Sequence, residues 1–322
     1  MLTTELTERL GIQHPIIQAG MGNGAGWELA AAVSNAGALG TIGTIPRTPD
    51  ETRAEIDATR AATDQPFAVN VVTFDWAPFA DDVLAAVIDA RPPVVTLSFG
   101  DAASKVAACR AAGLTTVVQV QDLRGLQEAV ESGADAIVVQ GNEAGGHTGR
   151  RGTLNFVAQA LDFVRDVPIV AAGGIGGGRG LAAALAMGCA GAVMGTRFKA
   201  SHEYVDDVSS KEEIVRSDGS DTVYDVIVDI ALGGRWPNGV TGRVLHNAFV
   251  DEWSGREDEL EAKVAQYDQF GFALELAEKG QHLNWAGESS GLVDVVLPAD
   301  EIVERTVREA TELLASSGAR FG

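Results

Sequence analysis

Short apolar runs that end in glycine or in a polar residue recur along this chain, and stretches of helical character separate them. The runs cover residues 16–20, 38–42, 67–71, 94–98, 115–120, 136–140, 169–172 and 192–194. Each run is long enough for a strand and short for a helix, and continuous apolar runs are typical of strands buried on both faces. The alternation of strands and helices predicts a parallel sheet, whose ligands bind at the carboxyl ends of the strands.

Eight such strands within about 200 residues predict a (β/α)8 TIM barrel. The alternative is an open doubly wound sheet, which uses fewer strands. Beyond residue 200 the pattern changes, because 201–230 is polar and acidic and Gly, Pro and Trp interrupt 233–251 before a helical stretch at 257–278. We therefore expect a smaller, mainly helical lobe of residues 201–284 that is inserted near the C-terminus and covers the substrate. Residues 1–200 and 285–322 would form the barrel, which a helix at 299–316 closes.

Charge and composition exclude several classes of partner. Acidic residues outnumber basic ones 45 to 24, for a formal charge of −21, so the protein repels nucleic acid and anionic membrane surfaces. No apolar run reaches the length of a membrane span, and two cysteines without a C-x-x-C motif fit a reducing compartment. The five histidines include no i, i+4 pair, so we expect no catalytic metal. We expect a cytoplasmic protein that acts on small molecules.

Glycines follow the seventh and eighth predicted strands. Gly173 and Gly174 come after one strand, and Gly195 and Thr196 come after the next. In barrels of this kind a phosphate commonly binds at these two loops, where backbone N–H groups and helix N-termini favour an anion. The alternative is that the glycines only make tight turns. Because they occur in both loops, they favour a phosphate site.

His147 follows the sixth predicted strand, on a loop at the same end of the barrel. An imidazole can take or give a proton near neutral pH, as a general acid or base must. The alternative is a loop histidine with a structural hydrogen bond. The convergence of the loops at this end favours catalysis.

Asn70 and Gln140 end two otherwise apolar strands. A buried amide must find hydrogen bonds, which a heteroaromatic ring with donors and acceptors would provide. The alternative is that each amide caps a neighbouring loop. Together with a phosphate site, the two amides suggest flavin mononucleotide (FMN).

The loop after the first strand, Gly-Met-Gly-Asn-Gly-Ala at 20–25, imitates the dinucleotide fingerprint G-x-G-x-x-A. That fingerprint also needs an acidic residue at the end of the next strand, and Thr41-Ile42-Gly43-Thr44 lacks one. We interpret the loop instead as small residues that pass close under a flat ring, with Met21 as an adaptable apolar contact. A plain turn is the alternative.

Three motifs resemble those of the nitronate monooxygenase family, formerly called 2-nitropropane dioxygenases. They are Gln-Gly-Asn-Glu-Ala-Gly-Gly-His at 140–147, Ala-Ala-Gly-Gly-Ile at 171–175 and Met-Gly-Thr-Arg-Phe at 194–198. The similarity covers nearly the whole chain and extends to the FMN-dependent enoyl-acyl-carrier-protein reductases. It implies a barrel that holds FMN without a covalent bond.

The resemblance also implies roles for individual residues. The backbone of Ala19, Gly20 and Met21 would lie beside the flavin, Asn70 and Gln140 would hydrogen-bond FMN, Gly145 would adjoin it, Gly174 and Val193, Met194, Gly195 and Thr196 would hold its phosphate, and His147 would be catalytic. Three features depart from the family. Gly20 stands where many members have proline, residues 148–151 replace a shorter continuation after the histidine, and the lobe sequence at 236–239 and 242–245 differs from the better characterised branches.

We expect an oxidoreductase that oxidises alkyl nitronates, or nitroalkanes, with O₂ to a carbonyl compound and nitrite. The alternative keeps fold and flavin but uses NAD(P)H to reduce an enoyl thioester or a quinone. A non-redox aldolase or isomerase is a third reading, but Lys199 is the only lysine near the strand ends. The lobe aromatics Trp253, Tyr267, Phe270 and Phe272 are expected to pack within the lobe, the alternatives being a cover for the pocket or a homodimer contact.

Overall fold

Eight parallel strands form the centre of the molecule. The computed structural model describes residues 2–74, 79–234, 236, 239–268 and 270–321. The strands are β1 (Ile16–Gln18), β2 (Gly40–Gly43), β3 (Phe67–Val72), β4 (Val94–Ser98), β5 (Thr115–Val120), β6 (Ala136–Gln140), β8 (Ile169–Ala172) and β9 (Gly191–Met194). They pair in the order β1-β9-β8-β6-β5-β4-β3-β2, and a parallel bridge between Ile17 and Leu39 joins the two ends. The sheet therefore closes into the predicted barrel, and the open doubly wound alternative is wrong.

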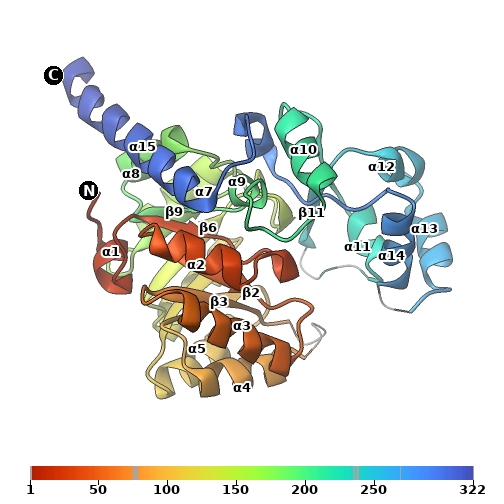
Figure 1. The fold of residues 1–322 in the computed structure, drawn as a ribbon, viewed down its shortest axis with the longest axis horizontal. Coiled ribbons are helices and arrows are strands. Elements are labelled where there is room, and N and C mark those ends of the chain that lie inside the picture. The colour runs from red at the N-terminus through yellow and green to blue at the C-terminus, as the bar shows by residue number, and fades with distance from the viewer. Residues whose placement is uncertain (1, 75–78, 235, 237–238, 269, 322) are drawn as a thin grey trace.

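Helices surround the strands (Figure 1). They are α2 (Trp27–Asn35), α3 (Pro49–Ala62), α4 (Ala80–Ala90), α5 (Ala102–Ala111), α6 (Leu123–Ser132), α7 (Thr153–Phe163), α8 (Gly178–Met187) and α15 (Ala299–Phe321). Local sequence sets their ends: Thr48 caps α3 by accepting from the N–H of Glu51, whose carboxylate accepts in return from Thr48, and Pro49 takes the first helical position. Of the helices in the described ranges, none is both long and apolar enough to cross a lipid bilayer.

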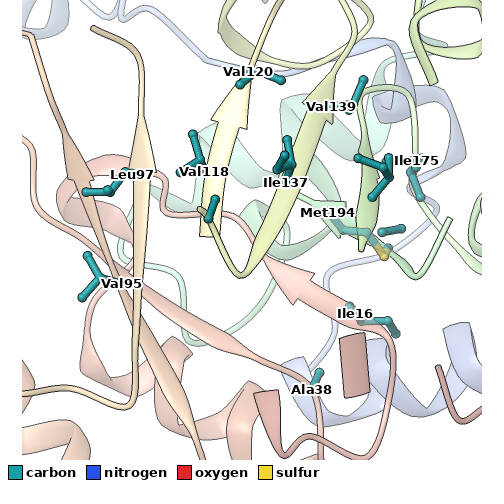
Figure 2. Packing of buried hydrophobic residues seen from close by; sticks show 14 of the residues in the cluster. Ile16, Ala38, Val95, Leu97, Val118, Val120, Ile137, Val139, Ile175 and Met194 are labelled. Atoms are coloured by element: carbon teal, nitrogen blue, oxygen red, sulfur yellow. The ribbon is translucent and has the colours of Figure 1, made fainter. Parts of the chain in front are cut away.

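Apolar side chains fill two layers, one on each face of the sheet. Val95, Leu97, Val118 and Val120 belong to the layer between strands and helices (Figure 2). Their neighbours Val94 and Val117 belong to a second cluster with Leu6 and Leu10 of α1 (Glu5–Leu10). Side chains alternate between the two faces of a strand, so each strand serves both layers. Full burial of one such side chain stabilises the fold by about 1.5–3 kcal/mol.

The second face becomes polar towards the carboxyl ends of the strands. Asn70, Thr96, Gln119 and Gln140 follow Ala68, Val94, Val117 and Val138 at a spacing of two, so they share the face of that second cluster. In the register of the sheet, Asn70 is opposite Thr96, and Ser98 is opposite Gln119. A polar band therefore lies above an apolar barrel interior.

The residues between α9 (Thr196–Lys199) and α15, which include those of the predicted lobe, lie to one side of the barrel (Figure 1). Their elements are α10 (Val208–Arg216), β10 (Thr222–Asp225), α11 (Ile227–Ala231), β11 (Thr241–Leu245), α12 (Ala248–Trp253), α13 (Glu257–Val264), α14 (Gly271–Glu278) and η3 (Glu288–Leu292). Trp253 and Phe272 are buried in an apolar cluster of the lobe, and Tyr267 packs against it. The helical stretch predicted over 257–278 is wrong in detail, because it is two helices. Phe270, with φ 67°, adopts a left-handed conformation at the start of α14.

A small antiparallel sheet joins the lobe to the barrel. It has the order β10-β11-β7, and β7 (Gly146–Thr148) is the segment that contains His147. Gly242 of β11 is opposite His147. The segment of His147 is predicted as a loop but is a short strand, because Gly242, 95 residues further along the chain, supplies its pairing partner. The division into a barrel and a lobe of residues 201–284 stays a prediction.

Candidate functional site

A small cavity lies among the carboxyl-terminal parts of the barrel strands. Its lining is Ile17, Gln18, Ala19, Gly20, Thr41, Asn70, Thr96, Val117, Gln119, Val138 and Val193. Four of the predicted site residues, Ala19, Gly20, Asn70 and Val193, are among them. They come from three strands or strand ends that the sequence separates widely, so the barrel brings these predicted residues together.

The Asn70 amide is oriented by its neighbours on β4. Its Nδ2 donates to Thr96 Oγ1 at 3.1 Å and to Ser98 Oγ at 3.2 Å. Within the described residues no hydrogen bond reaches Asn70 Oδ1. Asn70 therefore offers an acceptor to a ligand in the cavity.

Gln140 is oriented in the opposite sense. Its Oε1 accepts from Gln119 Nε2 at 3.2 Å and from Gln121 Nε2 at 3.1 Å. These two bonds leave the amide NH₂ of Gln140 to donate. Asn70 and Gln140 together can thus offer a ligand one acceptor and one donor group.

Sequence reasoning missed the residues that orient these amides. They are Thr96, Ser98, Gln119 and Gln121. Ser98 and Gln119 lie at or next to the ends of apolar strands, and Gln121 lies just beyond one, whereas Thr96 is the middle residue of β4. The rule that selected Asn70 and Gln140 would have found the first three if it had been applied to every strand.

The glycines after β8 and β9 differ in what their backbone requires. A β carbon on Gly173 would lie 2.7 Å from Thr153 Oγ1, so packing within the chain accounts for this glycine. At Gly195 a β carbon would meet nothing nearer than 3.6 Å, and φ there is −106°. No contact in the described part of the chain demands a glycine at 195, whereas a ligand that lies against the backbone would.

Two backbone donors of these loops are free for a ligand. Among the described residues, the N–H groups of Gly174 and Gly195 make no hydrogen bond. Gly174 has φ 71°, a left-handed conformation that favours glycine. Thr196 is buried, and its Oγ1 accepts from Gly287 N at 3.0 Å, so its hydroxyl proton is available. Such donors suit an anion.

Three other predicted residues lie nearby with different surroundings. Gly145 packs against the chain where it returns from the lobe, since a β carbon there would lie 2.5 Å from Gly287 N. The Met194 side chain is buried in the layer between strands and helices, so only its backbone can face a ligand. Met21 accepts from the Tyr204 hydroxyl at 3.3 Å through its carbonyl.

The imidazole of His147 is held by groups from the lobe. Nε2 lies 2.6 Å from Oδ1 of Asp229, which is fully buried on α11. The indole of Trp236 stacks on the ring at 3.7 Å between centroids and 12° between planes. The ring centroid of Trp285 lies 5.0 Å from that of His147. The His147 side chain is therefore mostly buried, and these contacts define its orientation.

Phe99 connects the histidine to the barrel mouth. It follows Ser98, the Asn70 partner, and its ring meets His147 edge-on at 6.5 Å and Trp236 at 4.9 Å. Phe99 has φ 64°, a conformation that costs an aromatic residue free energy and often marks functional sites. The His147 imidazole and the cavity thus lie at the same end of the barrel.

Sequence reasoning could not find Asp229 and Trp236. They lie 82 and 89 residues after His147, in a lobe whose pairing with β7 is a tertiary event. No motif or spacing marked them. Within the described ranges, no group of three or more His, Cys, Asp or Glu side chains is arranged to hold a metal ion.

Comparison with known proteins gives the chain a family. A sequence model of nitronate monooxygenase matches residues 3–80 and 77–309. A (3aS,4S,5R,7aS)-5-hydroxy-7a-methyl-1-oxo-octahydro-1H-indene-4-carboxyl-CoA dehydrogenase of Rhodococcus jostii is 38% identical over 274 residues, 84% of this chain and 73% of the relative. A nitronate monooxygenase of Paraburkholderia phytofirmans is 33% identical over an alignment that covers 93% of each chain.

Solved structures agree with the architecture. FabK from Thermotoga maritima superposes with a TM-score of 0.88 at 32% identity, over 100% of both chains. A nitroalkane oxidase from Streptomyces ansochromogenes superposes with a TM-score of 0.83 at 28% identity, over 97% of this chain and 99% of the other.

Proposed function

The chain belongs to the nitronate monooxygenase family of oxidoreductases, and we propose that it binds FMN and oxidises alkyl nitronates with O₂ to a carbonyl compound and nitrite. The observation that carries the proposal is the combination of oriented amides and free backbone donors at the mouth of the barrel with an oriented histidine at the same end. A nitronate is small and anionic, and a site with hydrogen-bond donors can stabilise its negative charge.

The polar groups at this end of the barrel fit FMN. Gln140 would donate to a flavin carbonyl, and the acceptor of Asn70 would face a ring N–H. The free N–H groups of Gly174 and Gly195, with the hydroxyl of Thr196, would hold the phosphate. When bound, FMN supplies electron transfer between the organic substrate and O₂.

His147 would act on the substrate rather than on the cofactor. As an imidazolium it would pair with the anionic nitro group of a nitronate, and as a neutral base it would remove the α-proton of a nitroalkane. The rings of Trp236, Trp285 and Phe99 surround the imidazole. These apolar surroundings favour an alkyl nitro compound over a highly charged substrate.

A spectrum followed by two anaerobic additions tests the proposal. The purified protein should be yellow, and propyl nitronate should bleach it while NADH does not. A yellow protein that NADH bleaches quickly would instead be a reductase. A colourless protein that cannot be reconstituted with FMN would overturn the cofactor assignment.

A second candidate is NAD(P)H-dependent reduction of an enoyl thioester. It is favoured by the superposition on FabK, an enoyl-acyl-carrier-protein reductase, with a TM-score of 0.88. The name of the Rhodococcus relative, a carboxyl-CoA dehydrogenase, also places a thioester in this family. Steady-state turnover of crotonyl-CoA with NADH or NADPH would decide for this candidate, and nitrite release from propyl nitronate would decide for the first.

A further inference from the structure

Asp229 is a carboxylate inside the lobe with no access to water. It is 0% exposed on α11, and its Oδ1 lies 2.6 Å from Nε2 of His147. Its Oδ2 accepts from the Thr241 hydroxyl. The Asp229 carbonyl accepts from the N–H groups of Leu232 and Gly234, both at 3.1 Å. Backbone and side chain are thus both fixed.

The charge of Asp229 determines which imidazole nitrogen carries a proton. A buried ionised carboxylate accepts hydrogen bonds and requires donors around it. Thr241 supplies one donor, and the group facing the other oxygen is His147 Nε2. Nε2 must therefore be protonated. In a neutral imidazole this leaves Nδ1 as the basic nitrogen.

Packing fixes the plane of the same ring. Trp236 stacks on one face of His147 at 3.7 Å, and Trp285 lies at 5.0 Å. Gly242, opposite His147 in the small sheet, has no β carbon, and one built there would lie 2.3 Å from the Trp285 ring. The stacking sets the plane of the imidazole, and the bond to Asp229 sets its rotation within that plane.

We propose that Asp229 is a positioning residue that the lobe supplies to the reactive histidine, holding it as the Nε2–H tautomer with Nδ1 as the base for a neutral nitroalkane. This inference rests on the proposed function. In the step, the α C–H bond of the nitroalkane breaks and its electron pair moves into the nitro group, giving a nitronate. The proton goes to Nδ1, and the resulting imidazolium keeps its Nε2–H on Asp229.

A comparison of two substrates separates positioning from mere stability. In Asp229→Asn, kcat for nitroethane should fall at least about 10²-fold with little change in KM, because proton abstraction needs the correct tautomer. Turnover of preformed ethyl nitronate, which needs no proton abstraction, should fall no more than a few-fold. Equal loss on both substrates would overturn the proposal.

Asp225→Asn is the matched control. Asp225 is a lobe carboxylate four positions earlier, and it bonds Ser254 Oγ at 2.8 Å rather than the histidine. Its variant should keep the wild-type ratio of nitroethane to nitronate turnover. If Asp225→Asn changes that ratio as much as Asp229→Asn does, the effect is a general response of the lobe and the proposal fails.

A tautomer measurement on the wild-type holoenzyme is independent of turnover. Imidazole ¹⁵N resonances, assigned by their loss in His147→Asn, should show His147 protonated at Nε2 and bare at Nδ1. A proton on Nδ1 of the neutral ring would overturn the proposal, even if Asp229→Asn does not fold. If the wild-type enzyme oxidises neither substrate, the proposed function fails, and the ¹⁵N result still decides what Asp229 does.

Discussion

Gly20 lies so close to Asn70 that any side chain at position 20 would displace the Asn70 side chain. A β carbon on Gly20 would lie 2.4 Å from the Asn70 β carbon and 2.9 Å from its Cγ. The glycine thus leaves room for the Asn70 side chain in the lining of the cavity, where Thr96 and Ser98 orient its amide. The backbone at Gly20 thus has no room for a side chain, although the resemblance leads one to expect proline at this position.

Gly20→Ala should therefore weaken FMN binding. The added methyl group must displace Asn70, so we expect Kd for FMN to rise about tenfold or more, as the loss of one hydrogen bond to a ligand implies. Quenching of FMN fluorescence on titration measures the affinity. Gly125→Ala is the control, because a β carbon there meets only ordinary contacts at 3.5 Å on the distant helix α6. Equal affinities in both variants would contradict the role of Asn70.

Gly195→Ala should lower the affinity for FMN, whereas Gly178→Ala should lower the stability of the fold. At Gly195 the nearest protein atoms lie 3.6 Å away, so the fold should tolerate alanine while FMN binds more weakly. At Gly178 a β carbon would lie 2.3 Å from the β carbon of Glu309, so alanine should destabilise the fold by about 1–3 kcal/mol. Thermal unfolding without ligand and FMN titration distinguish the two. If Gly195→Ala binds FMN as tightly as wild type does, the phosphate site at Gly195 is contradicted.

His147→Asn should separate binding from chemistry. Asparagine cannot take or give a proton near neutral pH, so kcat for nitroethane should fall by about 10²–10⁴-fold, the usual contribution of general acid–base catalysis. FMN affinity should stay within a factor of two or three, because the amides and glycines that would hold the cofactor are untouched. Nitrite release and FMN titration are the measurements. Unchanged turnover would remove His147 from the mechanism.

The two thiols should be unreactive in the folded protein. Burial raises the pKa of Cys109 to about 11 and that of Cys189 to about 12. At pH 8 both should react with a disulfide reagent only after unfolding. Fast reaction of the native protein at pH 8 would show that the thiols are accessible.

The same thiols should make stability depend on alkaline pH. The unfolded chain releases a thiol proton above its ordinary pKa of about 9, while the folded chain keeps it until about 11. Stability is thus fully present below about pH 9 and falls as the pH rises towards 11. Denaturant unfolding at pH 8 and pH 10.5 should show a smaller loss in Cys109→Ala than in wild type, and an equal loss would contradict this account.

The pattern of residues alone determined the barrel and the position of its mouth. Apolar runs with helices between them can bury their side chains on both faces only in a closed or covered parallel sheet, and eight such runs favour the closed barrel over the open doubly wound sheet, which uses fewer strands. Asn70, Gln140 and the glycine loops were predictable because the carboxyl ends of parallel strands converge wherever a barrel forms. The residue type at each strand end was enough to predict which residues lie at this mouth.

Tertiary structure decided what surrounds His147. Asp229 and Trp236 reach His147 only because β11 pairs with β7 and carries α11 of the lobe to the barrel mouth. That pairing depends on the register of short strands far apart in the chain, which no local propensity encodes. The sequence therefore contains the histidine and the carboxylate as separate residues, and the packing of the lobe makes them one site.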